Sequence, residues 1–305
     1  METQEGLFEG PEGSEASQEA PPGGVRLGTS SWSERGWVGP FYPPGTAPAA
    51  FLAHYAREFT AVEADVTYYR VPSLRMVEGW RDRTPPSFRL CAKFPREVVH
   101  AGEGRVPDPG ELLSGRRALA SAEAFVGAML TLGRRCGPLL LQFPWLSRGA
   151  FPEPGPFLER LAAFLTRLPR EVRVAVEIRN QEWLREDLLA VLREAGAGLV
   201  LADLPRMEHP DTAPPGFDLL TSDFLYVRLI GDRRVTDALT SSFDRVVVDR
   251  DERIERWAEW LAPMSARATE TFAFANNHFA GHGPATVRSL AAALARLGVE
   301  PRQPG

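Results

Sequence analysis

The sequence predicts a (β/α)8 TIM-barrel-like fold, and three observations support this prediction. Eight short apolar runs, each of the length of a strand, follow one another after residue 24. Helix-period segments or long loops separate these runs over about 280 residues, which is a usual size for such a barrel. No glycine-rich dinucleotide-binding turn follows the first run, so an open doubly wound sheet is the less favoured alternative.

Strands and helices can be assigned in order along the chain. The predicted strands are 25–30, 61–66, 88–94, 138–143, 173–179, 198–203, 224–230 and 271–276. The predicted helices carry apolar residues on one face and are 49–59, 157–168, 184–196, 253–261 and 285–298. The link 204–222 is rich in proline, so we expect a long loop there with at most one turn of helix.

The first 24 residues differ in composition from the rest of the chain. They contain six glutamates and no basic residue, with many glycines and prolines and few large apolar side chains. Such a segment buries too little apolar surface to offset its ordering entropy. We therefore predict a disordered acidic tail at 1–24 and one barrel domain at 25–305. The net charge of −5 comes mainly from the tail, and the barrel is close to neutral.

Composition argues against several classes of protein. No apolar run approaches the roughly 20 residues of a membrane-spanning helix, and the N-terminus resembles no secretory leader, so we expect a cytoplasmic protein without membrane association. Cys91 and Cys136 are isolated and are expected to be reduced. Scattered arginines on a near-neutral barrel argue against a nucleic-acid partner. No nucleotide-binding fingerprint is present, and the sequence gives no oligomeric state.

Polar side chains are predicted to gather at the C-terminal mouth of the barrel. Alternate residues of each strand face the barrel interior, and the polar ones come late in their strands, where such barrels have their active sites. The predicted mouth residues are Glu63, Asp65, Lys93, Glu177, Arg179, Asp203, Arg228, Asn277 and His278. A ring of structural ion pairs is the alternative, but so many charges together favour a ligand site.

The order of motifs resembles that of the YecE-like family, also called domain of unknown function 72. The matching segments are LGTSSWSERGWVGPFYPPGT (27–46), VEADVTYYRVPS (62–73), FRLCAKFPREVVH (88–100), GPLLLQFP (137–144), VAVEIRNQEW (174–183), LADLP (201–205), YVRLIG (226–231) and FANNHFAGHGP (274–284). The resemblance implies a (β/α)8-like fold and no established activity. This chain departs from the family pattern at Ser31, at Asp65, where the family has Asn, and at Ile230, where it has His.

Metal binding and anion binding are two kinds of chemistry open to the predicted mouth. A divalent metal ion would take the side chains of Glu63, Glu177, Asp203 and His278 as ligands, although the nearby cations disfavour it. A small phosphorylated or carboxylated substrate would be bound by Lys93, Arg179 and Arg228 and by the backbone N–H groups of Gly281 and Gly283, just before a helix.

Acid–base catalysis is the third kind. Glu177 beside Arg179 would be an ionised base with His278 as its partner acid, and a retaining glycosidase pair is also open. Substrate contacts are predicted for Asn276, Asn277, Trp32 and Tyr69. The aromatic rings would stack on a sugar or base, or they would form a hydrophobic lid over the barrel.

Two hypotheses for function remain. In the first, the protein is an enzyme of the hydrolase, lyase or isomerase type that acts on a small anionic substrate, with Glu177, His278, Asp203, Lys93 and Glu63 as catalytic residues. In the second, it is a non-catalytic protein that binds nucleic acid or a protein partner through the aromatic loop and the arginines. The charged mouth favours the first hypothesis.

Overall fold

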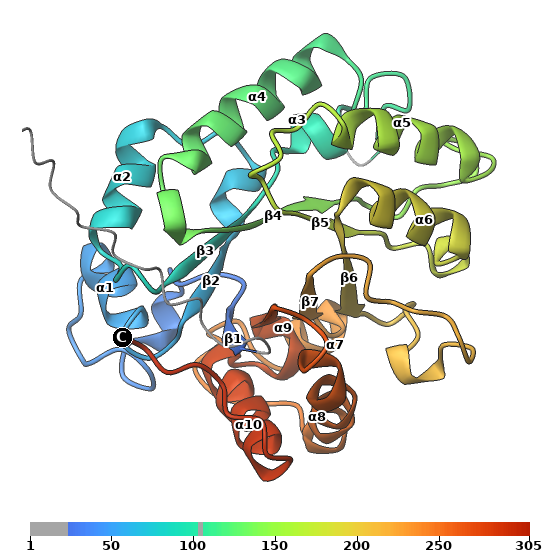
Figure 1. Ribbon diagram of the computed structural model, residues 1–305. Helices are drawn as coiled ribbons and strands as arrows, with labels where there is room; N and C mark the ends of the chain where they lie inside the picture. Colours follow the sequence, from blue (N-terminus) through green and yellow to red (C-terminus); the bar gives the residue numbers. More distant parts are fainter. Residues whose placement is uncertain (1–23, 103–105) are drawn as a thin grey trace, which may run out of the picture.

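A ring of eight parallel strands forms the centre of the computed structural model, which describes residues 24–102 and 106–305 (Figure 1). The strands are β1 (Gly24–Thr29), β2 (Ala61–Ala64), β3 (Arg89–Lys93), β4 (Cys136–Gln142), β5 (Val174–Glu177), β6 (Gly198–Asp203), β7 (Phe224–Leu229) and β8 (Glu270–Ala275). Consecutive strands pair from β2 through to β8, and β8 also pairs with β1. The predicted TIM-barrel-like fold is confirmed, with small shifts at the strand ends.

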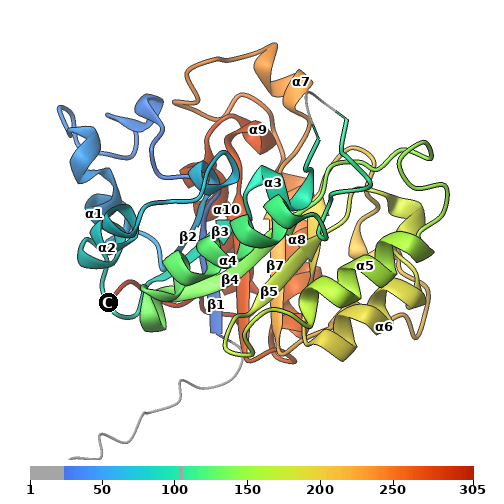
Figure 2. The same cartoon turned by 90° about the horizontal axis from the view of Figure 1, so that it is seen from above.

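Helices surround this ring on the outside (Figures 1 and 2). They are α1 (Phe51–Tyr55), α2 (Leu74–Asp82), α3 (Arg96–Val99), α4 (Arg116–Leu130), α5 (Gly155–Leu165), α6 (Glu186–Ala195), α7 (Arg233–Asp237), α8 (Asp251–Ser265), α9 (Asn277–Ala280) and α10 (Gly283–Arg296). The five predicted helices are present, but α2 and α4 were not assigned from the sequence. The link 204–222 contains one turn of 3-10 helix, Pro210–Thr212, as expected.

Strand side chains form two separate apolar layers. One set packs against the helices as the main core, and the other fills the inside of the barrel. The inner set is Ala61, Cys91, Leu140, Ala175, Val200, Phe224, Tyr226, Phe272 and Phe274. Charged residues lie beyond this inner layer at both ends of the strands. Cys91 and Cys136 are both free thiols, as expected.

The ring closes differently between β1 and β2, a junction that we call the β1–β2 seam. Among the described residues these two strands share no hydrogen-bonded ladder. The Tyr55 hydroxyl bridges them instead, accepting from the Thr29 N–H at 2.6 Å and donating to the Ala61 carbonyl at 3.2 Å. A Cβ on Gly28 would lie 1.9 Å from the Ala61 oxygen, so the strands approach this closely only because residue 28 has no side chain.

The predicted acidic tail lies outside the described residues, apart from Gly24, which is the first residue of β1. Within the part of the chain that the structure describes, no helix is long and apolar enough to cross a membrane.

Candidate functional site

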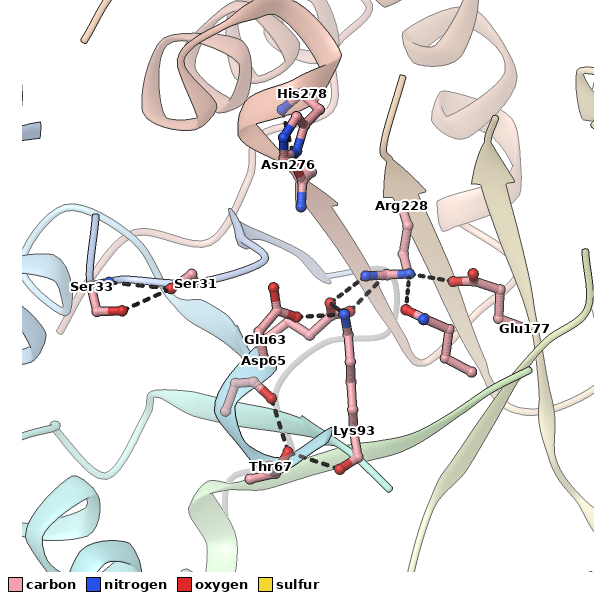
Figure 3. Close-up of polar contacts among 12 residues, drawn as sticks. Ser31, Ser33, Glu63, Asp65, Thr67, Lys93, Glu177, Arg228, Asn276 and His278 are labelled. Carbon is pink, nitrogen blue, oxygen red and sulfur yellow. Dashed lines mark hydrogen bonds and ion pairs between the residues drawn. The ribbon is translucent and has the colours of Figure 1, made fainter. Parts of the chain in front are cut away.

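A line of ion pairs crosses the barrel at the carboxyl ends of its strands, with Arg228 of β7 at its centre (Figure 3). The buried Arg228 guanidinium donates to Glu63 of β2 from Nε at 2.9 Å and from Nη2 at 2.6 Å. Its Nη1 donates to Glu177 of β5 and, at 2.9 Å, to Gln142 of β4. One side chain thus joins strands from several parts of the ring.

Both ends of this line reach solvent. At one end, Arg179 donates from Nε to Glu177 at 2.8 Å, and its side chain is 31% exposed. At the other end, Lys93 Nζ lies 3.5 Å from Glu63 and 2.5 Å from Asp65, whose side chain is 36% exposed. We call the whole sequence of contacts the Arg228 chain; it is buried in the middle and open at both ends.

Two carboxylates of the Arg228 chain are held ionised. Burial alone would raise the pKa of Glu177, but the charges of Arg228 and Arg179 lower that pKa to about 2. Burial of Glu63 is likewise outweighed by Arg228 and Lys93, and the Tyr226 hydroxyl donates to it at 2.8 Å, so the pKa of Glu63 is also lowered. A carboxylate with so low a pKa is a weak base, which disfavours Glu177 as the general base.

Asp65 differs from these carboxylates because its side chain is partly exposed, although its Oδ1 atom is buried. Its pKa is raised by burial and by the nearby charge of Glu63, although Lys93 opposes this shift. Glu63 receives donors from Arg228 and Tyr226 in addition to the ammonium group that the two carboxylates share. Glu63 is therefore held more firmly in its ionised form than Asp65, although the two carboxylates are coupled and titrate as a pair.

The predicted position of Asp203 is wrong. Val200 faces the barrel interior and Leu201 faces the helices, so the alternation turns Asp203 towards the helices as well. Its carboxylate accepts from Arg253 Nε at 2.6 Å and from Trp257 Nε1 at 2.7 Å, both in α8. Asp203 lies at the end of its strand, but it does not join the other mouth residues.

The four predicted metal ligands form no shared ligand set. Arg228 binds Glu63 and Glu177, and Asp203 faces α8, while His278 is held by other groups. Within residues 24–102 and 106–305, no cluster of three or more His, Cys, Asp or Glu side chains is arranged to hold a metal ion. The arrangement does not fit the divalent metal site proposed from the sequence.

His278 lies at the start of α9, in a group with Asn276. The Asn276 Oδ1 accepts the His278 N–H at 2.9 Å and lies 2.7 Å from its ring Nδ1, while Nε2 is 3.1 Å from Asp237 of α7. Burial lowers the pKa of His278, although Asp237 opposes the shift. Figure 3 shows this group apart from Glu177, its predicted acid–base partner.

The glycines after β8 belong to a closed turn. The Gly281 N–H donates to the Asn277 carbonyl at 2.7 Å, and the Gly283 N–H donates to the Asn277 side-chain oxygen at 2.9 Å. The same oxygen accepts from Trp37 Nε1 at 3.2 Å. Both glycine N–H groups are thus used within the turn, which argues against their binding an anion.

Most aromatic rings of the first loop pack into the core. Trp37 and Tyr42 are almost fully buried, and Tyr42 stacks on Phe51 of α1 with 4.4 Å between ring centroids. Trp32 is half-buried and meets Trp80 edge-on. Tyr69 is 81% exposed, so its ring remains open for a stacking contact.

Two members of the Arg228 chain were not among the predicted site residues. They are Tyr226, which donates to Glu63, and Gln142, which accepts from Arg228. Gln142 shares its strand face with Leu140, which fills the barrel interior. A polar residue that ends an apolar inner strand face is the signal that would have identified it.

The lowered pKa of Glu177 predicts that the folded protein loses stability in acid. Its pKa falls from about 4.5 to about 2 on folding, so its contribution of about 3 kcal/mol is complete above pH 4.5 and is lost as the pH falls towards 2. We expect the thermal midpoint of Glu177→Gln to change less across this range than that of the wild type. The exposed Asp82→Asn variant should keep the wild-type curve. Parallel curves for Glu177→Gln and wild type would contradict the assignment.

The fold and the charged mouth together define the class of protein, a TIM-barrel-like protein with polar residues at the C-terminal ends of its strands. A family model described as "Protein of unknown function DUF72" matches residues 26–304. The chain belongs to this DUF72 family, which confirms the resemblance seen in its motifs.

Curated relatives and solved structures agree with this membership. The UPF0759 protein YecE of Escherichia coli K12 is 28% identical to this chain over 184 residues. The match covers 59% of this chain and 59% of the length of that relative. A DUF72 family crystal structure from Thermotoga maritima is 27% identical with a TM-score of 0.65, covering 89% of this chain and 99% of that one. A DUF72 family crystal structure from Enterococcus faecalis is 20% identical with a TM-score of 0.62, and the match covers 89% of this chain and 95% of that one. At this identity it supports the fold alone.

Proposed function

We propose that the protein is an enzyme that transfers a proton to or from a small anionic substrate at the C-terminal mouth of the barrel, as a hydrolase, lyase or isomerase does. The observation that carries this proposal is the form of the Arg228 chain, which is buried in its middle and open at both ends. One open end offers a cation, Arg179, and the other offers a carboxylate with its cation, Asp65 and Lys93. These are groups that bind an anion and exchange a proton.

Arg179 is proposed to bind the anionic group of the substrate. Its Nε is bonded to Glu177, but its two Nη groups donate to no other residue in the described part of the chain. A partly exposed guanidinium with free terminal N–H groups binds the oxygens of a carboxylate or phosphate at two points. This supports a phosphorylated or carboxylated substrate.

Asp65 is assigned as the proton carrier, with Lys93 beside it. The raised pKa of Asp65 brings it closer to the working pH than the lowered pKa values of Glu63 and Glu177. Lys93 would stabilise negative charge on Asp65 or on the reacting substrate. The two buried glutamates then act as positioning residues that fix Lys93 and the arginines. His278 remains the proposed second proton carrier.

Anion binding is tested by thermal unfolding at constant ionic strength, with inorganic phosphate and succinate as probes. A probe at about ten times its Kd should stabilise the wild type by about 1.4 kcal/mol, which is about 3 °C in the midpoint. Arg179→Gln should lose the part of this shift that arises at the mouth. The exposed Arg185→Gln variant should keep it. If Arg179→Gln kept the full shift, the proposal that the anion binds at the mouth would be wrong.

Proton transfer is tested in D2O with a mixture of phosphorylated and carboxylated metabolites, followed by NMR and mass spectrometry. We expect the wild type to convert a compound of this mixture or to exchange its hydrogen for deuterium. Asp65→Asn should lower that rate about 100-fold or more, while the exposed Asp82→Asn should not. Binding without any conversion or exchange would favour the non-catalytic alternative.

A further inference from the structure

A second charged cluster lies at the opposite end of the barrel, at the amino ends of the strands. It contains Arg26 of β1, Arg89 of β3, Arg173 just before β5, Arg302 near the C-terminus and a single carboxylate, Glu270 of β8. We call it the arginine cluster. From it we propose a binding site for an oxyanion, a carboxylate or a phosphate, at the amino-terminal end of the barrel.

Glu270 cannot balance the charge of this cluster. It pairs with Arg26 through Oε1 and accepts from Arg173 Nη1 at 2.8 Å through Oε2. Arg89 Nε lies farther away, at 3.8 Å from Oε1. Arg302 interacts with Glu270 only through its charge, so four guanidinium groups and one carboxylate leave three positive charges that no other described carboxylate pairs with. An anion that binds several of them would complete the cluster.

The excess charge is partly withdrawn from water, which makes it costly. The Arg26 side chain is 5% exposed and that of Arg89 is 19% exposed. Burial, and then the charge of Arg26, lower the pKa of Arg89 to about 10. The pKa of Arg302 is lowered for the same two reasons. A lowered arginine pKa means that folding disfavours the charged form, and a bound anion would reverse this.

Arg302 holds an unused donor in the cluster. Its Nε is buried and has no hydrogen-bond partner in the described part of the chain. The backbone of Arg302 is tied to β1, because its N–H donates to the Val25 carbonyl at 2.8 Å. A Cβ on Gly24 would lie 2.0 Å from Nε, so the side chain lies directly on the start of β1. A buried, positioned N–H without an acceptor is what an anion site provides.

The arginine cluster is separate from the Arg228 chain. The inner apolar layer lies between them, and the Arg173 guanidinium carbon sits 5.4 Å from the ring centre of Phe272, a member of that layer. Figure 2 shows the barrel from the side, with the two ends of its strands well apart. The proposed oxyanion site therefore does not depend on the proposed enzyme function.

The anion has two possible sources with the same chemistry. One is a free carboxylate or phosphate in solution. The other is the chain itself, because six glutamates occur between residues 2 and 19, shortly before β1 begins at Gly24. Deletion of residues 2–23 distinguishes the two sources.

The test measures thermal midpoints in inorganic phosphate against chloride at matched ionic strength. The full chain, the 2–23 deletion and the variants Arg302→Gln, Arg89→Gln and Arg179→Gln are compared. Arg288→Gln, in which an exposed ion pair with Glu58 is lost, serves as the control. Phosphate bound at this site alone, at about ten times its Kd, should raise the midpoint by about 3 °C. Arg179→Gln should keep the part of the rise that arises at the arginine cluster. Arg302→Gln and Arg89→Gln should each lose most of that part.

The outcomes separate clearly. An equal rise in the full chain and in the deletion supports a free anion as the ligand. A rise that appears or grows on deletion, with a lower midpoint in chloride, supports the chain's own glutamates. No rise in either chain, or a rise that Arg302→Gln and Arg89→Gln both keep, overturns the proposal. Loss of the phosphate effect in Arg179→Gln alone would leave the mouth as the only anion site and would also overturn it.

Discussion

Arg228→Met is expected to lower the thermal midpoint of the protein by on the order of 10 °C. The substitution leaves the Glu63 and Glu177 carboxylates buried with no guanidinium between them. Removing one partner of a buried ion pair typically costs about 3–5 kcal/mol. Arg179 still contacts Glu177 and Lys93 still lies 3.5 Å from Glu63, so the two charges are compensated only in part. The measurement is thermal unfolding at pH 7, with circular dichroism to confirm that the variant is folded at low temperature.

Arg256→Met is the matched control. Arg256 binds Asp211 through two hydrogen bonds of 2.6 Å, so its geometry resembles that of Arg228 with Glu63, but both partners are exposed. We expect almost no change in its midpoint, because exposed ion pairs are screened by water. Adding Glu63→Gln and Glu177→Gln to Arg228→Met should recover much of the loss. Equal effects of the two arginine variants would show that burial is not what makes Arg228 important.

Gly28→Ala is expected to be at least as damaging, and little folded protein should be recovered. The new methyl group would lie 1.9 Å from the Ala61 carbonyl oxygen, far inside the contact distance of the two atoms. The obstacle is backbone, so it cannot move aside as a flexible side chain would. β1 and β2 would have to separate, which would also break the Tyr55 bridge at the β1–β2 seam. Yield and thermal midpoint of the purified protein measure the effect.

Gly127→Ala provides the comparison. Gly127 lies in α4, and a Cβ there meets nothing within 4 Å. Alanine is the better helix former, so this variant should be as stable as the wild type or more stable by about 0.5–1 kcal/mol. A Gly28→Ala variant that folds and melts like Gly127→Ala would mean that the seam is wider than the structure has it.

The fold could be predicted because strand alternation and helical periodicity are local properties of the sequence. Each apolar run indicated one strand, and the succession of eight such runs was enough to predict a barrel. α4 was not assigned because it is rich in alanine and its apolar face is weakly marked. Asp203 was placed incorrectly because its position at a strand end was given more weight than its place in the alternation of that strand.

The partners of each site residue could not be predicted in the same way. Arg228 meets Glu63 and Glu177 because of the register of non-adjacent strands around the ring, which no local pattern encodes. The glycines after β8 looked like an anion site because a glycine-rich turn before a helix has free N–H groups unless a side chain caps it. Asn277 is that cap, and only the three-dimensional structure reveals it.

The β1–β2 seam gives the barrel a preferred place to open. Every other neighbouring pair of strands is joined by backbone hydrogen bonds, whereas this one relies on a single phenolic hydroxyl among the described residues. Separation of β1 from β2 therefore needs fewer broken bonds than separation of any other pair, and it converts the closed ring into a sheet with two free edges. The least costly route out of the native state begins where Tyr55 takes the place of a ladder.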